Sequence, residues 1–256
     1  MPLQIVTVPC LSDNYAFLAH DGDTGATALV DVPEAGPILA ALDTRGWKLT
    51  DILITHHHWD HVGGLDEVRA AHPQARVLGA ASDAHRLPHL DVKLAEGDAV
   101  HVGGETGRVI DVSGHTVGHI AYHFPDSAVV FTADSLMALG CGRVFEGTLP
   151  QMWESLSKLA ALPPETLVCS GHEYTEANAR FAQTIDPGNS ALISRAKTIT
   201  DARAAGLATV PSTLAQELAT NPFLRAKDPE IQCNLGMEGA DPAAVFAEIR
   251  KRKDAF

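Results

Sequence analysis

Short apolar runs separated by glycine and aspartate recur up to about residue 172, a pattern that predicts β-strands. Between them, apolar residues at three- and four-residue spacing predict amphipathic helices. Thr148, Pro150 and Gln151 form a capping-box start for one of these helices. Strands are predicted over residues 26–32, 51–54, 107–112, 128–133 and 166–170, and helices over 35–45, 64–72 and 151–162.

Beyond residue 172 the strand signals nearly vanish, and helical patterns follow one another between prolines and glycines. These helices are predicted over residues 174–185, 191–205, 212–219 and 241–253. The shift predicts an α+β fold of two domains, a mixed domain over residues 1–172 and a helical domain over residues 173–256.

Composition and charge narrow the class of protein. The 256 residues are 45% hydrophobic and 20% charged, as expected for a globular chain with a substantial core. A net charge of −13 without a basic stripe argues against a nucleic-acid partner. No apolar window reaches ~18 residues and no signal-peptide pattern is visible, so no membrane association is expected. The four cysteines lack Cys-Xaa-Xaa-Cys spacing and indicate reduced thiols of a cytoplasmic protein.

The segment Thr55–His61, Thr-His-His-His-Trp-Asp-His, carries the strongest chemical signal. It lies between a predicted strand and a predicted helix. Along an extended backbone His56 and His58 face the same way and can bind one ion, while a turn redirects Asp60 and His61 toward a second. Imidazole and carboxylate suit zinc, iron or manganese better than calcium. Histidine-rich tracts also occur as tags or solvated loops, but this one is internal and lies between two regular elements.

Three further candidate ligands follow predicted strands in the same way. His115, Asp134 and His172 each come directly after an apolar run and a short turn. Ligands at successive strand ends are what a site at one edge of a sheet requires. His119 and His123 alternate with an alanine and are expected on a half-exposed strand instead.

These positions, in this order, resemble the signature of the metallo-β-lactamase superfamily. Asp31, at the end of the strand over 26–32, resembles the aspartate that orients the ligands in that superfamily. Within the superfamily the chain is similar to the glyoxalase II (hydroxyacylglutathione hydrolase) family along essentially its whole length. The segments that carry this narrower resemblance are Asp13–Tyr15, Gly140–Thr148, Gly171–Thr175 and Ile249–Phe256.

The resemblance implies a binuclear metal centre in a four-layer αβ/βα sandwich, followed by a helical domain that completes a glutathione pocket. Two divalent metal ions are expected, with zinc as the first choice and iron or manganese as alternatives that the ligand types do not separate. The resemblance assigns His56, His58 and His115 to one metal, Asp60, His61 and His172 to the other, and Asp134 to both.

The expected chemistry is hydrolysis of S-D-lactoylglutathione and related 2-hydroxyacylglutathiones, which belongs to methylglyoxal detoxification. A hydroxide bridging the metals is expected to attack the thioester carbonyl, and Asp60 and Asp134 are the residues assigned to catalysis. The leaving thiolate has a conjugate-acid pKa of ~8.5, so no separate general acid is needed.

Residues that recognise the substrate are expected in the middle and at the end of the chain. Arg250 and Lys253 share one helical face and match the family's contacts to the glycine carboxylate of glutathione, although basic residues at a helix end also complement the helix dipole. Arg143 and Tyr174 match two further contacts. Phe145 departs from relatives that have tyrosine there, so no polar contact is expected from it. The glutathione thioester is the only partner expected, and the chain is expected to be monomeric.

Three other functions fit parts of the pattern. A persulfide dioxygenase-like enzyme of this superfamily would hold a single iron and act on glutathione persulfide, and metal count together with the basic C-terminal helix distinguishes the hydrolase from it. A metallo-nuclease conflicts with the acidic net charge. A non-enzymatic metal-binding protein would not need seven ligands arranged around an open bridging position.

Overall fold

The computed structural model describes residues 1–256, which form two compact units. The first unit comprises residues 1–111 and 117–133, and the second comprises residues 112–116 and 134–256. These units group the residues that contact one another most densely. The domain boundary after residue 172 is a different kind of division and stays a prediction.

A mixed six-stranded sheet forms the larger part of the first unit. The first three strands are antiparallel neighbours, whereas the third to the sixth are parallel. Parallel neighbours need a crossover, and α1 (Ala35–Arg45) and α3 (Leu65–Ala71) provide the first two. In order across the sheet the strands are β1 (Gln4–Cys10), β2 (Asn14–His20), β3 (Thr27–Val30), β4 (Asp51–Leu53), β5 (Arg76–Ala80) and β6 (Val92–Leu94).

An antiparallel meander forms the second sheet of this unit. Its strands are β7 (Ala99–Val102), β8 (Glu105–Asp111), β9 (Ile120–Phe124) and β10 (Val129–Ala133). The two sheets meet through buried aromatic rings, with Phe17 and Phe131 centred 5.7 Å apart. The Tyr122 hydroxyl donates a 2.7 Å hydrogen bond to the carbonyl of Ile54, and burial keeps the pKa of Tyr122 well above its ordinary value. This bond holds the end of β4 in place where the histidine-rich segment begins.

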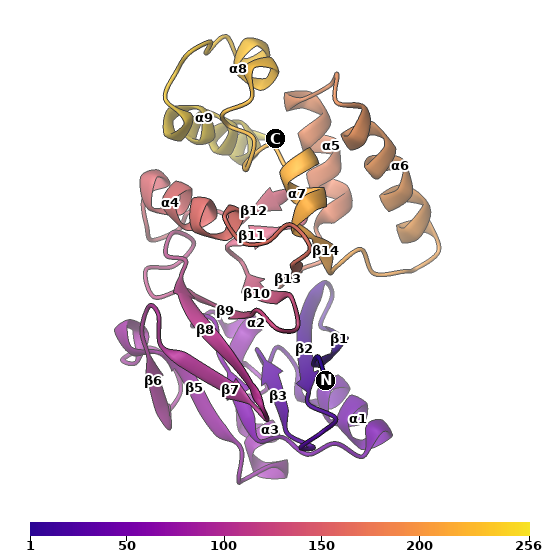
Figure 1. The fold of residues 1–256 in the computed structure, drawn as a ribbon, viewed down its shortest axis with the longest axis vertical. Coiled ribbons are helices and arrows are strands. Elements are labelled where there is room, and N and C mark those ends of the chain that lie inside the picture. The colour runs from indigo at the N-terminus through magenta and orange to yellow at the C-terminus, as the bar shows by residue number, and fades with distance from the viewer. The chain divides into compact units, whose positions relative to one another are not determined.

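The second unit is mostly helical, as Figure 1 shows in its orange and yellow segments. Two short strand pairs accompany the helices: β11 (Leu136–Met137) with β12 (Gly140–Cys141), and β13 (Leu167–Ser170) with β14 (Ser212–Thr213). The helices are α4 (Leu149–Ala160), α5 (Thr175–Ile185), α6 (Ser190–Ala204), α7 (Leu214–Thr220), α8 (Pro229–Leu235) and α9 (Pro242–Ala255). Phe223 packs between Phe181 and Phe246, with ring centroids 6.1 and 6.0 Å away, and forms the aromatic core of the unit.

All seven predicted helices and all five predicted strands are present, with ends shifted by a few residues. The predicted start of α4 is confirmed, because Thr148 and Gln151 form a complete capping box. Two short helices were not predicted, α2 (Trp59–Val62) and α8, and neither is long enough to show clear periodicity. The half-exposed strand predicted around residues 119–123 is wrong in its exposure: β9 is buried on both faces except at His123.

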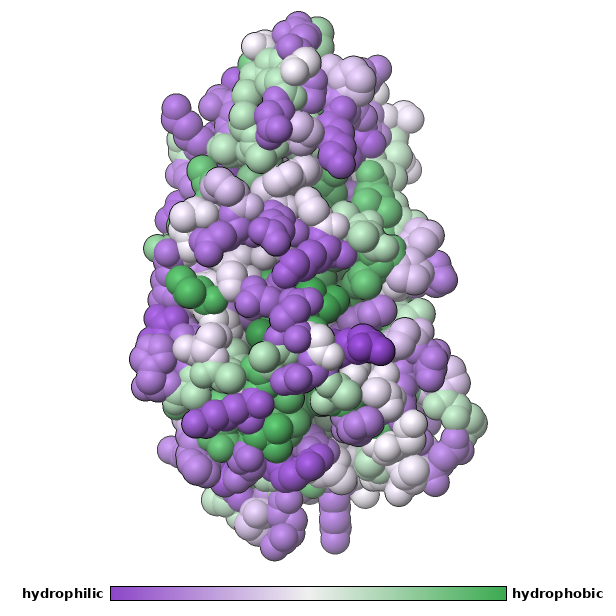
Figure 2. Space-filling model, turned by 60° about the vertical axis from the view of Figure 1, so that its left-hand side comes forward, coloured by the Kyte–Doolittle hydropathy of each residue, from purple (hydrophilic) through white to green (hydrophobic).

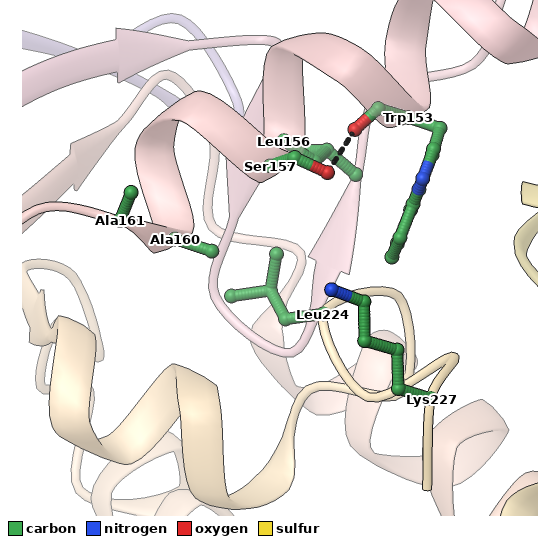
Figure 3. A pocket seen from close by; sticks show the side chains of 7 residues that line it. All are labelled: Trp153, Leu156, Ser157, Ala160, Ala161, Leu224 and Lys227. Carbon is green, nitrogen blue, oxygen red and sulfur yellow. Dashed lines mark hydrogen bonds between the residues drawn. The ribbon is translucent and has the colours of Figure 1, made fainter. Parts of the chain in front are cut away.

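A side cavity of about 260 Å³ lies in the second unit between α4 and the segment that follows α7 (Figure 3). The Trp153 indole forms one wall, and the Lys227 side chain reaches in beside it from the segment that follows α7. None of the lining residues is a predicted site residue, so this cavity is not the expected active site. The lining consists of Trp153, Leu156, Ser157, Ala160, Ala161, Leu224 and Lys227.

The face drawn in Figure 2 shows hydrophilic side chains interspersed with small hydrophobic patches. No helix combines the length and the hydrophobicity that crossing a bilayer would require.

Candidate metal centre and substrate site

The first unit contributes a cluster that we call the first half-site: His56, His58, Asp60 and His61. It begins directly after β4, where the chain leaves the sheet, and runs into α2. His56 Nε2 lies 3.1 Å from His58 Nδ1. Two nitrogens in the tetrahedral shell of one zinc ion lie about 3.3 Å apart, so this spacing suits two ligands of a shared ion.

Hydrogen bonds fix the tautomer of His56. The Thr55 hydroxyl donates its proton to Asp31 Oδ2 at 2.8 Å and therefore accepts at 3.0 Å from His56 Nδ1. A neutral His56 then carries its proton on Nδ1 and presents the lone pair of Nε2 toward His58. That is the form of imidazole that binds a metal.

Asp31 orients the first half-site. It lies just beyond β3 with φ of 57°, a left-handed conformation that aspartate tolerates better than most residues. Its oxygens accept from the Thr55 backbone N–H at 2.9 Å, from the Thr55 hydroxyl and from His61 Nδ1 at 2.8 Å. Asp31 lies close enough to His56 and His61 to be counted with them as a possible ligand, yet its lone pairs already accept these bonds. We therefore assign it to the orientation of His61, which it contacts through Nδ1.

Asn14 has a role that the sequence did not reveal. Its side-chain amide donates to the carbonyl oxygen of Asp60 at 3.0 Å and to Asp60 Oδ2 at 3.1 Å. Asn14 opens β2, so this contact fastens the β1–β2 turn to the predicted ligand. The residue belongs to the segment Asp13–Tyr15 that carries the family resemblance, which was the available signal.

Two neighbouring histidines are structural. His57 contacts Asp83 Oδ2 through Nδ1 at 3.0 Å, and Asp83 also accepts from Arg86. The His57 ring lies edge-on to that of His58, with centroids 4.9 Å apart. His119 is fully buried and stacks on His56 with ring centroids 4.6 Å apart. The expectation that His119 lies on a half-exposed strand is therefore wrong, because the ring instead packs against a predicted ligand.

The second unit contributes the second half-site: His115, Asp134 and His172. The three follow β8, β10 and β13 in sequence. His115 Nε2 lies 3.4 Å from Asp134 Oδ2, and His172 Nε2 lies 3.3 Å from Asp134 Oδ1. All three side chains are nearly buried. Each imidazole thus faces a different oxygen of one carboxylate, at the spacing of neighbouring ligands in a metal shell.

The tautomer of His115 can be assigned from its other nitrogen. Nδ1 lies 2.7 Å from the carbonyl oxygen of Arg143, which can only accept, so Nδ1 carries the proton. In a neutral His115 the lone pair of Nε2 then faces a carboxylate oxygen of Asp134. Two electron-rich atoms at this distance repel each other, and a cation between them would stabilise the arrangement. The donor set therefore fits a divalent metal.

The backbone around Asp134 is unusually constrained. Ala133, directly before it, has φ of 41°, which is costly for a residue with a Cβ atom. Gly142 lies so close to the Asp134 carbonyl oxygen that a Cβ atom there would clash, and its N–H donates to Ser135 at 3.1 Å. The β11–β12 hairpin thus returns the chain to Asp134, and only glycine permits so close an approach.

Two aromatic rings flank the second half-site. Tyr174 stacks on His172 with ring centroids 4.7 Å apart and planes only 7° from parallel. The Phe145 ring lies 5.2 Å from that of His115 and is 60% exposed. Tyr174, a predicted substrate contact, therefore lies beside a candidate ligand. Phe145, from which no polar contact was expected, presents a hydrocarbon surface where tyrosine would present a hydroxyl.

Arg143, Arg250 and Lys253 form a basic cluster in the second unit. Arg250 is only 5% exposed and donates to the Cys141 carbonyl oxygen at 2.9 Å. Arg143 is more than half exposed, and both arginines donate to Asp254. The structure thus brings the three predicted basic residues into one region, with Lys253 and Arg143 accessible and Arg250 largely occupied by protein partners.

The Lys253 side chain is half-buried beside two aromatic rings. Its ammonium lies 5.1 Å from the centroid of Phe181 and 5.4 Å from that of Phe256. Burial, followed by repulsion from Arg250 and Arg180, lowers the pKa of Lys253 to about 8. No carboxylate pairs with this ammonium. A bound anion would therefore offset the burial and the repulsion that disfavour its charged form.

Comparisons with known proteins place the chain in a family. The family model for the metallo-β-lactamase superfamily matches residues 20–172, and that for the hydroxyacylglutathione hydrolase C-terminus matches residues 173–256. Proteins named hydroxyacylglutathione hydrolase from Ruegeria pomeroyi and Cereibacter sphaeroides are 66% and 65% identical to it over 256 residues, covering all of both chains.

The fold has solved counterparts as well. The crystal structure of ETHE1 from Myxococcus xanthus matches with a TM-score of 0.66 and 25% identity, covering 100% of this chain and 99% of that one. The predicted α+β metallo-β-lactamase fold with a C-terminal helical region is thereby confirmed. Matched along its full length by these relatives, and over residues 20–256 by the two family models in succession, the chain belongs to the hydroxyacylglutathione hydrolase family of the metallo-β-lactamase superfamily.

Proposed function

We propose that this protein hydrolyses S-D-lactoylglutathione and related 2-hydroxyacylglutathiones to a 2-hydroxy acid and glutathione, as a step of methylglyoxal detoxification. The observation that carries the proposal is the pair of imidazoles facing the two oxygens of Asp134, in a chain whose full-length relatives bear the hydrolase name. The identity of those relatives, 65% and 66%, favours this function over the persulfide dioxygenase alternative.

We infer that the two half-sites together hold two divalent metal ions. His56, His58 and His115 would bind one ion, Asp60, His61 and His172 the other, and Asp134 both. Zinc is our first choice, with iron and manganese as alternatives, because all three metals accept imidazole and carboxylate ligands. When bound, such a pair supplies Lewis acidity and a hydroxide nucleophile at neutral pH.

The protein's own contribution is to hold the ligands in their binding forms. Asp31 keeps the proton of His61 on Nδ1, and the Arg143 carbonyl does the same for His115. Asn14 fixes the position of Asp60. These contacts remove the need to reorganise side chains during the reaction, which is where much of the catalytic advantage of such sites arises. The leaving glutathione thiolate is stable enough to depart without a protein acid.

The glutathione part of the substrate would meet the basic cluster. Lys253 and Arg143 are accessible cations and suit a carboxylate, while Tyr174 offers a ring surface beside His172. Arg250 is nearly buried, so its proposed contact to the substrate would come from the edge of a guanidinium that is already hydrogen-bonded.

Replacing Lys253 by alanine is expected to raise KM for the glutathione thioester about tenfold or more, with kcat within about threefold of wild type. The reason is that the ammonium binds a part of the substrate that does not change during the reaction. Lys251→Ala, on the exposed side of the same helix, is the matched control and should leave both constants unchanged. Arg250→Ala should also raise KM. A collapse of kcat with KM unchanged would rule out a binding role.

The KM of the wild-type protein is expected to rise with pH above about 8, because Lys253 loses its charge there. Below that pH the lysine stays protonated and KM should be flat. The rise should be absent in Lys253→Ala, whose KM is already high, and a rise of the same size in that variant would assign it to another group.

A direct comparison of substrates separates the two candidate functions. Purified metal-loaded protein should hydrolyse S-D-lactoylglutathione, and should consume no oxygen when given glutathione persulfide. We further propose that it works as a monomer in the cytoplasm, in keeping with its four free cysteines.

A further inference from the structure

Asp254 joins two of the predicted substrate-binding arginines through a single oxygen. Asp254 Oδ1 lies 3.2 Å from Arg143 Nε, 3.1 Å from Arg250 Nε and 2.9 Å from Arg250 Nη2. Arg143 follows β12, whereas Asp254 lies on α9, 111 positions further along the chain. One carboxylate therefore ties the end of the hairpin to the C-terminal helix.

Arg143 has a fixed backbone and a loosely held side chain. Its carbonyl oxygen accepts from His115 Nδ1 at 2.7 Å, which fastens the residue to the second half-site. Its side chain is 54% exposed, and Asp254 is the only carboxylate in salt-bridge contact with it. Its guanidinium also lies 6.0 Å from the centroid of the Phe145 ring, a contact that is weak at an exposed site. Without Asp254, binding an anion would first have to immobilise a long and weakly held side chain, at a cost in affinity.

Arg250 gives Asp254 little freedom to move away. The two residues are four apart on α9, and the Arg250 side chain is 6% exposed. Its guanidinium also donates to the Cys141 carbonyl oxygen and lies 5.2 Å from the Phe223 ring. A buried guanidinium that lost its carboxylate would be strongly destabilised, so the Arg250–Asp254 pair should persist when substrate binds.

We propose that Asp254 is a positioning residue that holds the Arg143 guanidinium beside that of Arg250 and so preorganises the cations that receive the glutathione carboxylate. This rests on the proposed function. Three cations and one carboxylate leave two positive charges in excess, so the cluster still attracts an anion. Asp254 acts through Arg143 and need not touch the substrate itself.

The opposite role would be competition, in which Asp254 occupies the cations and has to be displaced by the substrate carboxylate. The two roles differ in sign. Removing the charge of a positioning residue weakens substrate binding, whereas removing a competitor strengthens it.

The test is Asp254→Asn, compared with Glu248→Gln on the same helix. Glu248 accepts from Arg252 at 2.8 Å and contacts neither Arg143 nor Arg250, so this control removes the same charge without the bridge. We expect Asp254→Asn to raise KM for S-D-lactoylglutathione about tenfold while kcat stays within about twofold. The dissociation constant for glutathione, measured by calorimetry without turnover, should rise by a similar factor, and the control should change neither constant.

A double-mutant cycle with Arg143→Ala tests whether Asp254 acts through Arg143. The double variant should be little worse than Arg143→Ala alone, because the positioned side chain is already absent. Fully multiplicative effects, or a KM that falls or stays constant in Asp254→Asn, would overturn the proposal. If Asp254→Asn fails to fold by thermal melting, Arg143→Ala alone must still raise KM with kcat retained, and an unchanged KM would overturn it. A wild-type protein that does not hydrolyse the thioester would instead refute the proposed function.

Discussion

Replacing Asp134 by alanine should abolish thioester hydrolysis, with kcat/KM falling at least ~10³-fold, and should release at least one metal ion. Both oxygens of this carboxylate face an imidazole, from His115 at 3.4 Å and from His172 at 3.3 Å. Removing the shared ligand therefore affects both proposed metals at once. Metal analysis of the purified variant by mass spectrometry, beside the activity assay, measures the effect.

The control for this variant is Asp126→Asn. Asp126 is an exposed carboxylate in the turn before β10, whereas Asp134 directly follows the end of that strand. Replacing Asp126 should change neither metal content nor activity. An Asp134→Ala protein that kept two metals and wild-type turnover would show that the carboxylate is no ligand.

Replacing Asp31 by asparagine should lower metal affinity about 10–100-fold while the protein stays folded. Asparagine tolerates the left-handed backbone at φ of 57°, so the change mainly removes charge and one acceptor oxygen. His61 would then lose the partner that keeps its proton on Nδ1, and Thr55 would lose part of its anchor. Competition with a chelator of known affinity measures the loss.

Asp51→Asn is the matched control for this second variant. Asp51 is also a buried carboxylate, but it opens β4 and pairs with Arg76, away from the strand end that carries the histidines. Its replacement should lower stability without changing metal affinity. Equal losses of affinity in both variants would mean that Asp31 acts through general stability alone.

The strand ends and the candidate ligands were readable in the sequence because each has a local signature. A buried strand is an apolar run, and a ligand directly after it, such as Asp134 after residues 128–133, interrupts that run with a polar residue. Helical spacing likewise placed Arg250 and Lys253 on one face of α9. The local pattern thus predicted many of the elements and the residue types of the candidate site.

Residues that act through long-range contacts were not predictable in this way. Asn14 reaches Asp60 from 46 positions away, and Asp254 reaches Arg143 from 111. Nothing in the local sequence of either residue indicates its partner, because tertiary packing alone brings them together. The prediction that His119 is half-exposed was wrong for the same reason, because its stacking on His56 depends on how two distant segments pack.

The proposal that this chain is a binuclear thioester hydrolase can be tested by assaying purified protein on S-D-lactoylglutathione while counting its bound metals. We predict about two divalent ions per chain, release of free thiol and D-lactate in equal amounts, and loss of activity on removal of the metals by a chelator with recovery on their return. A protein that binds two metals yet leaves this thioester intact would contradict the claim.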